Sequence, residues 1–339
     1  MKVLVTGGAG YIGSHVVRDL IGSGHEVVVL DNLSHGHLVA VDPRAQFVKG
    51  SISDYYLLES LFTEEDIEAV AHLAGFIEVS ESVADPAKYY QNNFSQTLIL
   101  LEAMKNCHIR KIVFSSTAAV YGEPEFLPIT ESHRLQPKNP YGRSKLMVEN
   151  ILSDFAQAYE ISYIVLRYFN AAGAHPDSTI GEDHPHETHL IPRILKSALT
   201  GKPEVRVFGT DYETSDGTCV RDYIHVSDLA KAHTLALEKI EEMSGNVYNL
   251  GSEKGFSVHE VIMECQKVTG INFSVIKEER RAGDPAVLIA SSEKIFKDLG
   301  WTRRYSDLGD IIQHAWDWHR LHPIGYKSTT QQKPAWYFF

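Results

Sequence analysis

VLVTGGAGYIGS, residues 3–14, joins a short apolar run to glycines at positions 7, 10 and 13. The apolar run is typical of a buried parallel strand, and the apolar residues after Gly13 take helical spacing as far as residues 22–24. A second apolar run, residues 26–30, ends at Asp31. The sequence therefore predicts a βαβ unit of about thirty residues with an acid at the tip of its second strand.

This unit has the features of a dinucleotide site. Glycines let the backbone approach a pyrophosphate, and a helix N-terminus offers N–H groups and the positive end of its dipole. Asp31 can accept hydrogen bonds from ribose hydroxyls and would repel a 2′-phosphate, which favours NAD over NADP. A glycine triplet alone also occurs in tight turns. A dinucleotide site is the stronger interpretation here, because the strand, the glycines, the helix, the second strand and the acid all occur in this order.

Composition and charge narrow the class of protein. The chain has 339 residues, of which 43% are hydrophobic, which is enough for a large core in two lobes. Its net charge of −12 argues against nucleic acid or an acidic membrane surface as a partner. Three cysteines without a close pair indicate neither a disulfide framework nor a thiolate metal site. With a core strand at the start and no apolar run of transmembrane length, we expect a soluble cytoplasmic protein.

Strand and helix patterns alternate through the first half of the chain, which predicts an α/β fold with a doubly wound parallel sheet. The strand at 111–117 changes from apolar to hydroxyl-bearing residues at its carboxyl end, where ligands bind in open sheets. Asp54 is a predicted helix N-cap. Further strands are expected at 46–52, 68–75 and 163–168, and helices at 54–62, at 89–104 and after 139.

Tyr141 and Lys145 are four residues apart and project from one face of a predicted helix. A free phenol with a pKa of about 10 is a poor base at neutral pH, but a nearby ammonium and a positive nicotinamide favour the phenolate. A hydroxyl from Thr117 or Ser116 can align a substrate hydroxyl. Alone, the pair would be a buried tyrosine beside a solvated lysine. Because a predicted dinucleotide-binding unit precedes them in the chain, we favour a catalytic pair.

The second half is expected to hold a smaller α/β lobe, and residues 173–192, rich in Gly, Pro, His and Asp, mark the passage into it. Asp228 is a predicted N-cap of a helix that runs towards residue 239, and the strand at 246–250 should return to the main sheet. The expected domains are an NAD-binding Rossmann domain at 1–172 with about 222–255, a substrate domain at 173–221 and 256–330, and an apolar tail at 331–339.

Three histidines, His184, His186 and His189, suggest zinc. Pro185 breaks any helix that would align them, and no thiolate or clear carboxylate spacing joins them. The sequence therefore favours a polar loop, and we predict no metal site.

Four motifs resemble the extended short-chain dehydrogenase/reductase family: TGGAGYIG at 6–13, DNLS at 31–34, SSTAAVYG at 115–122 and YGRSK at 141–145. Within that family, nearly the whole chain resembles the branch that epimerises UDP-hexoses at C4. The more specific matches resemble the part that binds the nucleotide sugar: LRYFN at 166–170, GAHP at 173–176, FGTDY at 208–212, DGTCVRDYIHV at 216–226 and YNLG at 248–251.

The resemblance implies reversible oxidation at C4 of a UDP-glucose or UDP-galactose. Tyr141 as phenolate would accept the 4-hydroxyl proton, while tightly bound NAD would take a hydride and later return it to the opposite face of a transient 4-keto sugar. Thr117 would hydrogen-bond to the same oxygen. Lys145 would hold the nicotinamide ribose and keep the pKa of Tyr141 low. A homodimer through the helices around 91–106 and 141–158 is also implied.

The resemblance also implies which residues hold the two ligands, with arginine forks pairing with the diphosphate. An isolated arginine would otherwise be read as a surface ion pair. The NAD contacts would be Gly7, Gly10, Tyr11, Ile12, Gly13, Asp31, Asn32, Ser51, Ile52, Leu73, Ala74, Gly75, Asn92, Ser115, Tyr141, Lys145 and Tyr168. The UDP-sugar contacts would be Thr117, Asn170, His189, Leu190, Val207, Phe208, Arg221, Arg281, Asp284 and Leu288.

Neighbouring activities are disfavoured by Ala118 and Ala119, which stand where nucleotide-sugar 4,6-dehydratases carry an acid pair and UDP-glucuronate decarboxylases usually a glutamate. Three residues depart from the common epimerase pattern: Ser51, Ile77 and Thr117. Leu288, a side chain of medium size, stands at a position that resembles the one limiting the size of the sugar in this family. Substrate choice is therefore more open than reaction type. Alternatives are a UDP-N-acetylhexosamine, UDP-pentose or UDP-uronate epimerase, a plain NAD-dependent sugar dehydrogenase, and a silent NAD-binding sensor.

Overall fold

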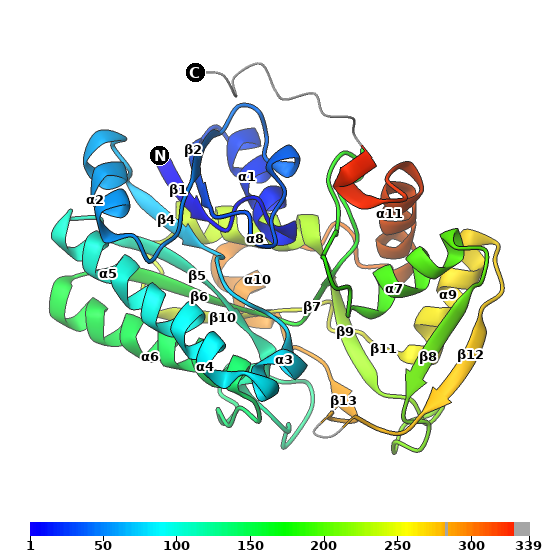
Figure 1. The fold of residues 1–339 in the computed structure, drawn as a ribbon. Helices are drawn as coiled ribbons and strands as arrows, with labels where there is room; N and C mark the ends of the chain where they lie inside the picture. Colours follow the sequence, from blue (N-terminus) through cyan, green and yellow to red (C-terminus); the bar gives the residue numbers. More distant parts are fainter. Residues whose placement is uncertain (282–283, 329–339) are drawn as a thin grey trace.

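A computed structural model describes residues 1–281 and 284–328, which form two lobes (Figure 1). Within this part of the chain, the larger lobe is built on a seven-stranded parallel sheet with strand order β10-β6-β5-β4-β1-β2-β3. This confirms the α/β, doubly wound class. The strands are β1 (Lys2–Thr6), β2 (Glu26–Asp31), β3 (Gln46–Lys49), β4 (Ala69–His72), β5 (Lys111–Thr117), β6 (Ser162–Tyr168) and β10 (Asn246–Leu250).

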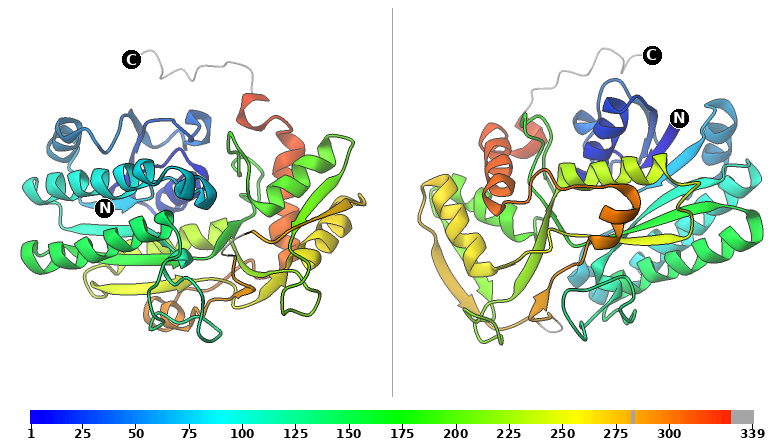
Figure 2. Two further views of the ribbon diagram at one scale, coloured as in Figure 1. Left: turned by 60° about the horizontal axis from the view of Figure 1, so that its bottom comes forward. Right: turned by 180° about the vertical axis from the view of Figure 1, so that it is seen from behind.

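Helices cover both faces of this sheet (Figure 2) because alternate strand residues enter two separate cores. Val3 and Val5 of β1 pack in one core with α1 (Tyr11–Gly22) and α8 (Val226–Glu238). Leu4, between them, packs in the other core with the helices α2 (Tyr55–Glu64), α5 (Gln96–Asn106) and α6 (Pro140–Tyr159). The near-continuous apolar character of β1 follows from burial on both faces.

The smaller lobe holds two further sheets beside helices α7 (Leu190–Leu199), α9 (Val258–Thr269) and α11 (Leu308–Leu321). In one sheet β9 (Val220–His225) lies between β11 (Gly255–Ser257) and β13 (Val287–Leu288) and also pairs with β7 (Asn170–Ala172). The other sheet pairs β8 (Glu204–Phe208) with β12 (Ser274–Glu278). The three helices and both sheets share one apolar core. No helix in the described part of the chain combines the length and the apolar character needed to cross a membrane.

Local signals placed most elements correctly. Asp54 accepts a hydrogen bond from Leu57 N at the start of α2, as predicted for an N-cap. Asp228 was expected to cap α8, and this is wrong: the cap is His225, whose side chain accepts from Ser227 N. Asp228 lies in the first turn and accepts instead from the backbone N–H groups of residues 304 and 305. A contact with a segment more than seventy residues away therefore accounts for this carboxylate.

The helix expected over 89–104 is divided in the structure. α3 (Val79–Ala84) and α4 (Pro86–Tyr89) precede a π-helical segment, Tyr90–Ser95, which passes directly into α5. π-Helical turns are rare, and here the turn carries Asn93, which is buried at 2% exposure. Apolar spacing at 3.6 residues does not reveal this change of helix type, because both forms continue in the same direction.

The two lobes are more interleaved along the chain than expected. β10 returns to the main sheet as predicted, but α10 (Glu293–Leu299), expected in the substrate domain, also packs on the larger lobe. Ile295, Leu299 and Trp301 share one core with β1 and α8, and Trp301 Nε1 donates to Asp228 O at 2.9 Å. The apolar tail at 331–339 lies outside the described residues.

We predict that Ile295→Ala lowers the free energy of unfolding by about 2–5 kcal/mol, because it empties a site in the core of the larger lobe. Denaturant titration followed by circular dichroism measures the change. Phe296→Ala, in the same helix but 60% exposed, is the matched control and should change stability by less than about 0.5 kcal/mol. Equal losses in the two variants would contradict the packing of α10 on the sheet.

Candidate active site

The turn between β1 and α1 is shaped by backbone contacts that leave no space for side chains. Gly7 has φ +74°, and a Cβ there would lie 2.8 Å from Ala74 N. A Cβ at Gly13 would overlap the carbonyl oxygen of Gly7. The first turn of α1 therefore lies directly against the carboxyl ends of β1 and β4. The glycines were predicted on this physical ground, and the structure supplies the contacts.

The same turn fits the pyrophosphate of a dinucleotide. α1 has Gly10 at its N-cap, and no described side chain caps this end, so the N–H groups of its first turn are available to an anion. Asp31, at the end of β2, accepts from Ala9 N at 3.0 Å and Leu33 N at 2.8 Å. Burial raises the pKa of Asp31, while these two backbone hydrogen bonds act against the rise. Its carboxylate is held at the tip of β2, as a ribose-binding acid requires.

The remaining predicted NAD contacts lie along one edge of the sheet. Asn32 follows β2, Leu73, Ala74 and Gly75 follow β4, and Ser51 and Ile52 lie beyond β3, which ends earlier than predicted. Ser51 Oγ accepts from Ser53 Oγ at 2.8 Å, and Ile77 is 41% exposed. Tyr11 differs from the other positions because its hydroxyl donates to Gly173 O at 2.7 Å and ties the turn to the smaller lobe.

The predicted catalytic residues meet where β5 ends and α6 begins. Asn139 caps α6 by accepting from Gly142 N, which places Tyr141 and Lys145 in the first two turns. Both side chains are buried, at 8% and 4% exposure. Lys145 Nζ donates to Ser115 O at 2.9 Å and lies 4.9 Å from the centre of the Phe114 ring. Thr117 ends β5 opposite Tyr168 of β6, so five of the predicted residues, Ser115 included, lie together.

Burial controls the proton affinities of this group. It raises the pKa of Tyr141, and a hydrogen bond with Thr117 acts in the opposite direction. It also lowers the pKa of Lys145 to about 8, against the attraction of Glu149. The ammonium of Lys145 is held by the backbone carbonyl of Ser115. A positive charge near the ring favours the phenolate, and an oxidised nicotinamide would supply one.

Two buried networks beside this group were not predicted from the sequence. Asn93 accepts from Phe76 N at 2.8 Å and donates to Ser144 Oγ at 3.2 Å, so it joins the segment after β4 to α6. Asn92, predicted to contact NAD, donates to Asn93 Oδ1. Glu149 of α6 is paired with Arg167 of β6 and accepts from the hydroxyl of Ser116. Ser116 is thereby occupied, which leaves Thr117 as the hydroxyl that faces Tyr141.

Most of the predicted substrate contacts lie on the smaller lobe. Arg221 of β9 pairs in register with Leu288 of β13, and its guanidinium lies 3.6 Å from Asp284 Oδ1. The guanidinium of Arg281 lies 4.0 Å from the centre of the Phe208 ring at the end of β8. Val207 precedes Phe208, Asn170 begins β7, and His189 and Leu190 begin α7. Two cations thus lie among apolar groups, an arrangement suited to a diphosphate beside a base.

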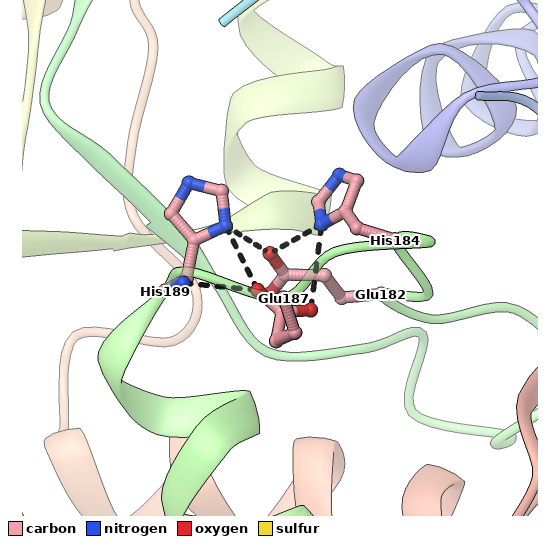
Figure 3. Close-up of side chains that lie close together, drawn as sticks. All are labelled: Glu182, His184, Glu187 and His189. Carbon is pink, nitrogen blue, oxygen red and sulfur yellow. Dashed lines mark hydrogen bonds and ion pairs between the residues drawn. The ribbon is translucent and has the colours of Figure 1, made fainter. Parts of the chain in front are cut away.

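Between Gly181 and Leu190, four side chains form a compact group that we name the His–Glu cluster: Glu182, His184, Glu187 and His189 (Figure 3). The sequence shows no clear carboxylate spacing to these histidines, yet the fold brings Glu182 and Glu187 against two of them. Burial opposes the charged form of His184, but its contacts with the two glutamates outweigh this and raise its pKa to about 9. The pKa of His189 is raised for the same reason. His186 is exposed and not part of the cluster.

We predict that Gly13→Ala abolishes retention of NAD, because the new methyl group displaces the backbone that the pyrophosphate would contact. The ultraviolet spectrum of the purified protein and calorimetric titration with NAD measure the loss. Gly22→Ala is the matched control at the other end of α1, where a Cβ meets nothing within 4 Å, and it should bind NAD normally. Undiminished NAD binding by a folded Gly13→Ala protein would refute the site.

Comparison with known proteins agrees with this geometry. A UDP-glucose 4-epimerase of Lacticaseibacillus casei is 51% identical over 96% of this chain and 99% of its own. A crystal structure of a UDP-glucose 4-epimerase superposes with a TM-score of 0.93 at 47% identity, covering 96% of this chain and 99% of that one. The enzyme of Bifidobacterium longum in complex with NAD+ and UDP gives 0.92 at 41% identity, covering 96% and 100%.

The family model described as the NAD dependent epimerase/dehydratase family matches residues 3–251, which include the glycine turn, Asp31, Thr117, Tyr141 and Lys145. This match covers most of the chain, and the relatives above are similar over nearly all of it. The chain therefore belongs to the NAD dependent epimerase/dehydratase family, as its resemblance to the extended short-chain dehydrogenase/reductases implied.

Proposed function

We propose that this chain is a UDP-glucose 4-epimerase that interconverts UDP-glucose and UDP-galactose with retained NAD. The observation that carries the proposal is the meeting of Tyr141, Thr117 and Lys145 at the carboxyl end of β5, with Arg221 and Arg281 on the facing lobe. The first group suits proton transfer at a sugar hydroxyl, and the second suits a diphosphate. Relatives of this name at about half sequence identity support it.

In the proposed reaction, bound NAD supplies the hydride acceptor and donor that oxidation at C4 and its reversal require. Tyr141 accepts the proton of the 4-hydroxyl and later returns it to the same oxygen. Thr117, which hydrogen-bonds with Tyr141, orients that hydroxyl between them. Lys145, fixed by the carbonyl of Ser115 beside Gly75, would bind the nicotinamide ribose, and Asp31 would bind the adenosine ribose.

Epimerisation also requires the 4-keto sugar to present its opposite face before it is reduced. The UDP part must therefore stay bound while the hexose turns. Arginines that stack on an aromatic ring or pair with a carboxylate are preorganised for the diphosphate, as Arg281 and Arg221 are. The catalytic hydroxyls lie on the larger lobe, whereas the arginines proposed to bind the diphosphate lie on the smaller lobe.

The alternatives receive less support. Intact Tyr141, Lys145 and Thr117 argue against a silent NAD-binding sensor, and relatives named as epimerases argue against a plain dehydrogenase. Leu288 lies in register with Arg221 and is partly buried, so its side chain borders the proposed substrate contacts. Its medium bulk suits a hexose and leaves UDP-N-acetylhexosamines and UDP-pentoses as substrates to be compared in the assay.

A homodimer and a cytoplasmic location are part of the same proposal. α6 and the preceding π-helical segment border a surface groove with an apolar lining, which supports an interface between two copies; it is formed by Tyr90, Pro137, Arg143, Leu146, Met147 and Asn150. The three cysteines are free, which suits a reducing compartment. A monomeric mass by light scattering, or secretion of the native protein, would contradict these two points.

The test is proton NMR of UDP-galactose incubated with the purified protein without added nucleotide. We expect the anomeric signal of UDP-glucose to appear, because the cofactor is retained and regenerated in each cycle. A strict requirement for added NAD, with net formation of NADH, would instead identify a dehydrogenase. Parallel incubations with UDP-N-acetylglucosamine and UDP-xylose rank the alternative substrates.

Two variants should separate chemistry from anchoring. Tyr141→Phe removes the base and should lower kcat by about 10²–10⁴-fold with UDP affinity unchanged. Arg281→Ala removes a charged partner of the diphosphate and should weaken UDP binding by about ten- to a hundredfold. Arg280→Ala is the matched control, because the neighbouring Arg280 already pairs with Asp211 at 2.7 Å. Undiminished turnover by Tyr141→Phe, or UDP affinity equal in both arginine variants, would refute the assignments.

A further inference from the structure

We propose that the His–Glu cluster is a binding site for one divalent transition-metal ion of the Zn²⁺ type, held by two imidazole nitrogens and two carboxylates. The observations behind this site are separate from those behind the proposed reaction, although His189 is also a predicted UDP-sugar contact. Among residues 1–281 and 284–328, it is the one group of three or more potential ligands whose ligand atoms converge, all within 4.8 Å of one another.

The spacing of the ligand atoms fits a small four-coordinate ion. Ligands about 2.0–2.2 Å from a tetrahedral metal lie about 3.3–3.6 Å from one another. His184 Nδ1 lies 3.4 Å from Glu182 Oε1 and 3.4 Å from Glu187 Oε2. His189 Nδ1 lies 3.2 Å from Glu187 Oε1 and 2.8 Å from Glu182 Oε1. The two separations of His184 are close to those of a tetrahedron. His189 meets the other oxygen of Glu187, so binding one ion requires the Glu187 carboxylate to turn one oxygen towards both histidines, and the 2.8 Å separation to widen by about half an ångström.

The cluster atoms face a common centre and leave hydrogen-bonding capacity unused. His184 Nδ1, His189 Nδ1 and Glu187 Oε2 are inaccessible to solvent, yet none makes a hydrogen bond of ordinary geometry to any described residue. The side chains of Glu182 and Glu187 are only 5% and 8% exposed. Buried polar atoms normally have partners, so three unsatisfied atoms around one point indicate a missing one. Figure 3 shows one nitrogen of each histidine directed at the carboxylates and the other directed away.

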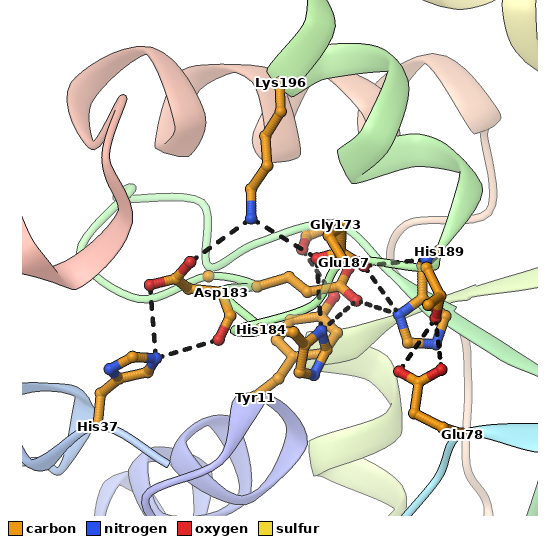
Figure 4. A network of polar contacts seen from close by, with 12 residues as sticks. Tyr11, His37, Glu78, Gly173, Asp183, His184, Glu187, His189 and Lys196 are labelled. Carbon is orange, nitrogen blue, oxygen red and sulfur yellow. Dashed lines mark hydrogen bonds and ion pairs between the residues drawn. The ribbon is translucent and has the colours of Figure 1, made fainter. Parts of the chain in front are cut away.

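The charges around the cluster also favour a divalent ion. Glu182 and Glu187 carry two negative charges into a buried place, and Asp183 adds a third beside them. Lys196 Nζ lies 3.5 Å from Asp183 Oδ1 and 3.7 Å from Glu187 Oε2 and supplies a single positive charge (Figure 4). Two charges remain to be balanced, either by two protonated histidines or by one divalent ion with both histidines neutral. The unsatisfied geometry favours the ion.

The ligand types select the class of metal. Imidazole suits zinc and its neighbours, whereas magnesium and calcium prefer sites made of oxygen alone. Four protein ligands would close the coordination sphere, as in structural zinc sites, so we assign the ion a structural role.

The site lies in the segment between β7 and α7 of the smaller lobe, and this segment also contacts the larger lobe (Figure 4). Tyr11 OH donates to Gly173 O at one end of this segment, and Thr188 Oγ1 donates to Glu78 Oε2 at 2.9 Å at the other. His37 Nε2 lies 3.1 Å from Asp183 O between them. A metal bound at Glu182 and His189 would fix the loop that joins these contacts and would set the start of α7.

The experiment uses the full chain, stripped with a chelator and freed of it, and titrated with ZnCl₂ and separately with MgCl₂ by calorimetry. We expect one tightly bound Zn²⁺ per chain after dialysis, measured by plasma mass spectrometry, and no saturable binding of Mg²⁺. Because an ion that binds only the folded protein stabilises it, Zn²⁺ should also raise the Tm. None of these readouts uses sugar turnover, so this inference and the proposed function can fail separately.

His184→Gln and Glu187→Gln each remove one ligand and should weaken Zn²⁺ binding by at least about tenfold. His186→Gln is the matched control, in the same loop but outside the cluster, and should bind Zn²⁺ as the unchanged protein does. If a ligand variant fails to fold, Co²⁺ in the unchanged protein keeps the test valid, since a tetrahedral Co²⁺ site gives intense visible absorption that one equivalent of Zn²⁺ should abolish. Absence of stoichiometric Zn²⁺, or equal affinity in all variants, would show that protonated histidines balance the glutamates and would overturn the proposal.

Discussion

The close approach of the backbone at Gly7 and Gly13 is the constraint on which the site depends. Because a Cβ at either position would collide with backbone, α1 begins directly at the carboxyl ends of β1 and β4. Asp31 is tied to the same turn through Ala9 N, and Tyr11 connects it to the smaller lobe through Gly173 O. The parallel order of the sheet then brings β5 and α6 to the same edge, and with them the tyrosine, the lysine and the threonine.

Much of this could be predicted from the sequence, because the signals are local. The glycine turn, the acid after β2 and the helix cap at Asp54 each depend on residues within a few positions of one another. The pairing of Tyr141 with Lys145 needs only helical spacing. The edge on which they meet follows from the rule that parallel strands end at one side of a sheet. Fold class and chemistry were therefore accessible before any contact was known.

The features that escaped prediction depend on contacts between distant parts of the chain. Asp228 resembles a helix cap in sequence, but it binds the backbone of residues 304 and 305. Asn93 is one of two adjacent asparagines, and only the π-helical turn reveals which of them is buried. Glu182 and Glu187 show no regular spacing to the histidines, since an irregular loop brings them together. In each case the side chain is polar and its partner lies outside the local pattern.

The return of β10 and α10 to the larger lobe bears on how the protein is made. The edge strand of the seven-stranded sheet ends at residue 250, and α10, which completes one of its two cores, ends at residue 299. A ribosome delivers the chain from its N-terminus, so most of the smaller lobe has emerged before the nucleotide-binding lobe is complete. Until β10 has emerged, β6 is the edge strand of the larger lobe's sheet and has no partner on its outer side. The core of the larger lobe is therefore complete only when α10 has emerged, shortly before α11 completes the smaller lobe.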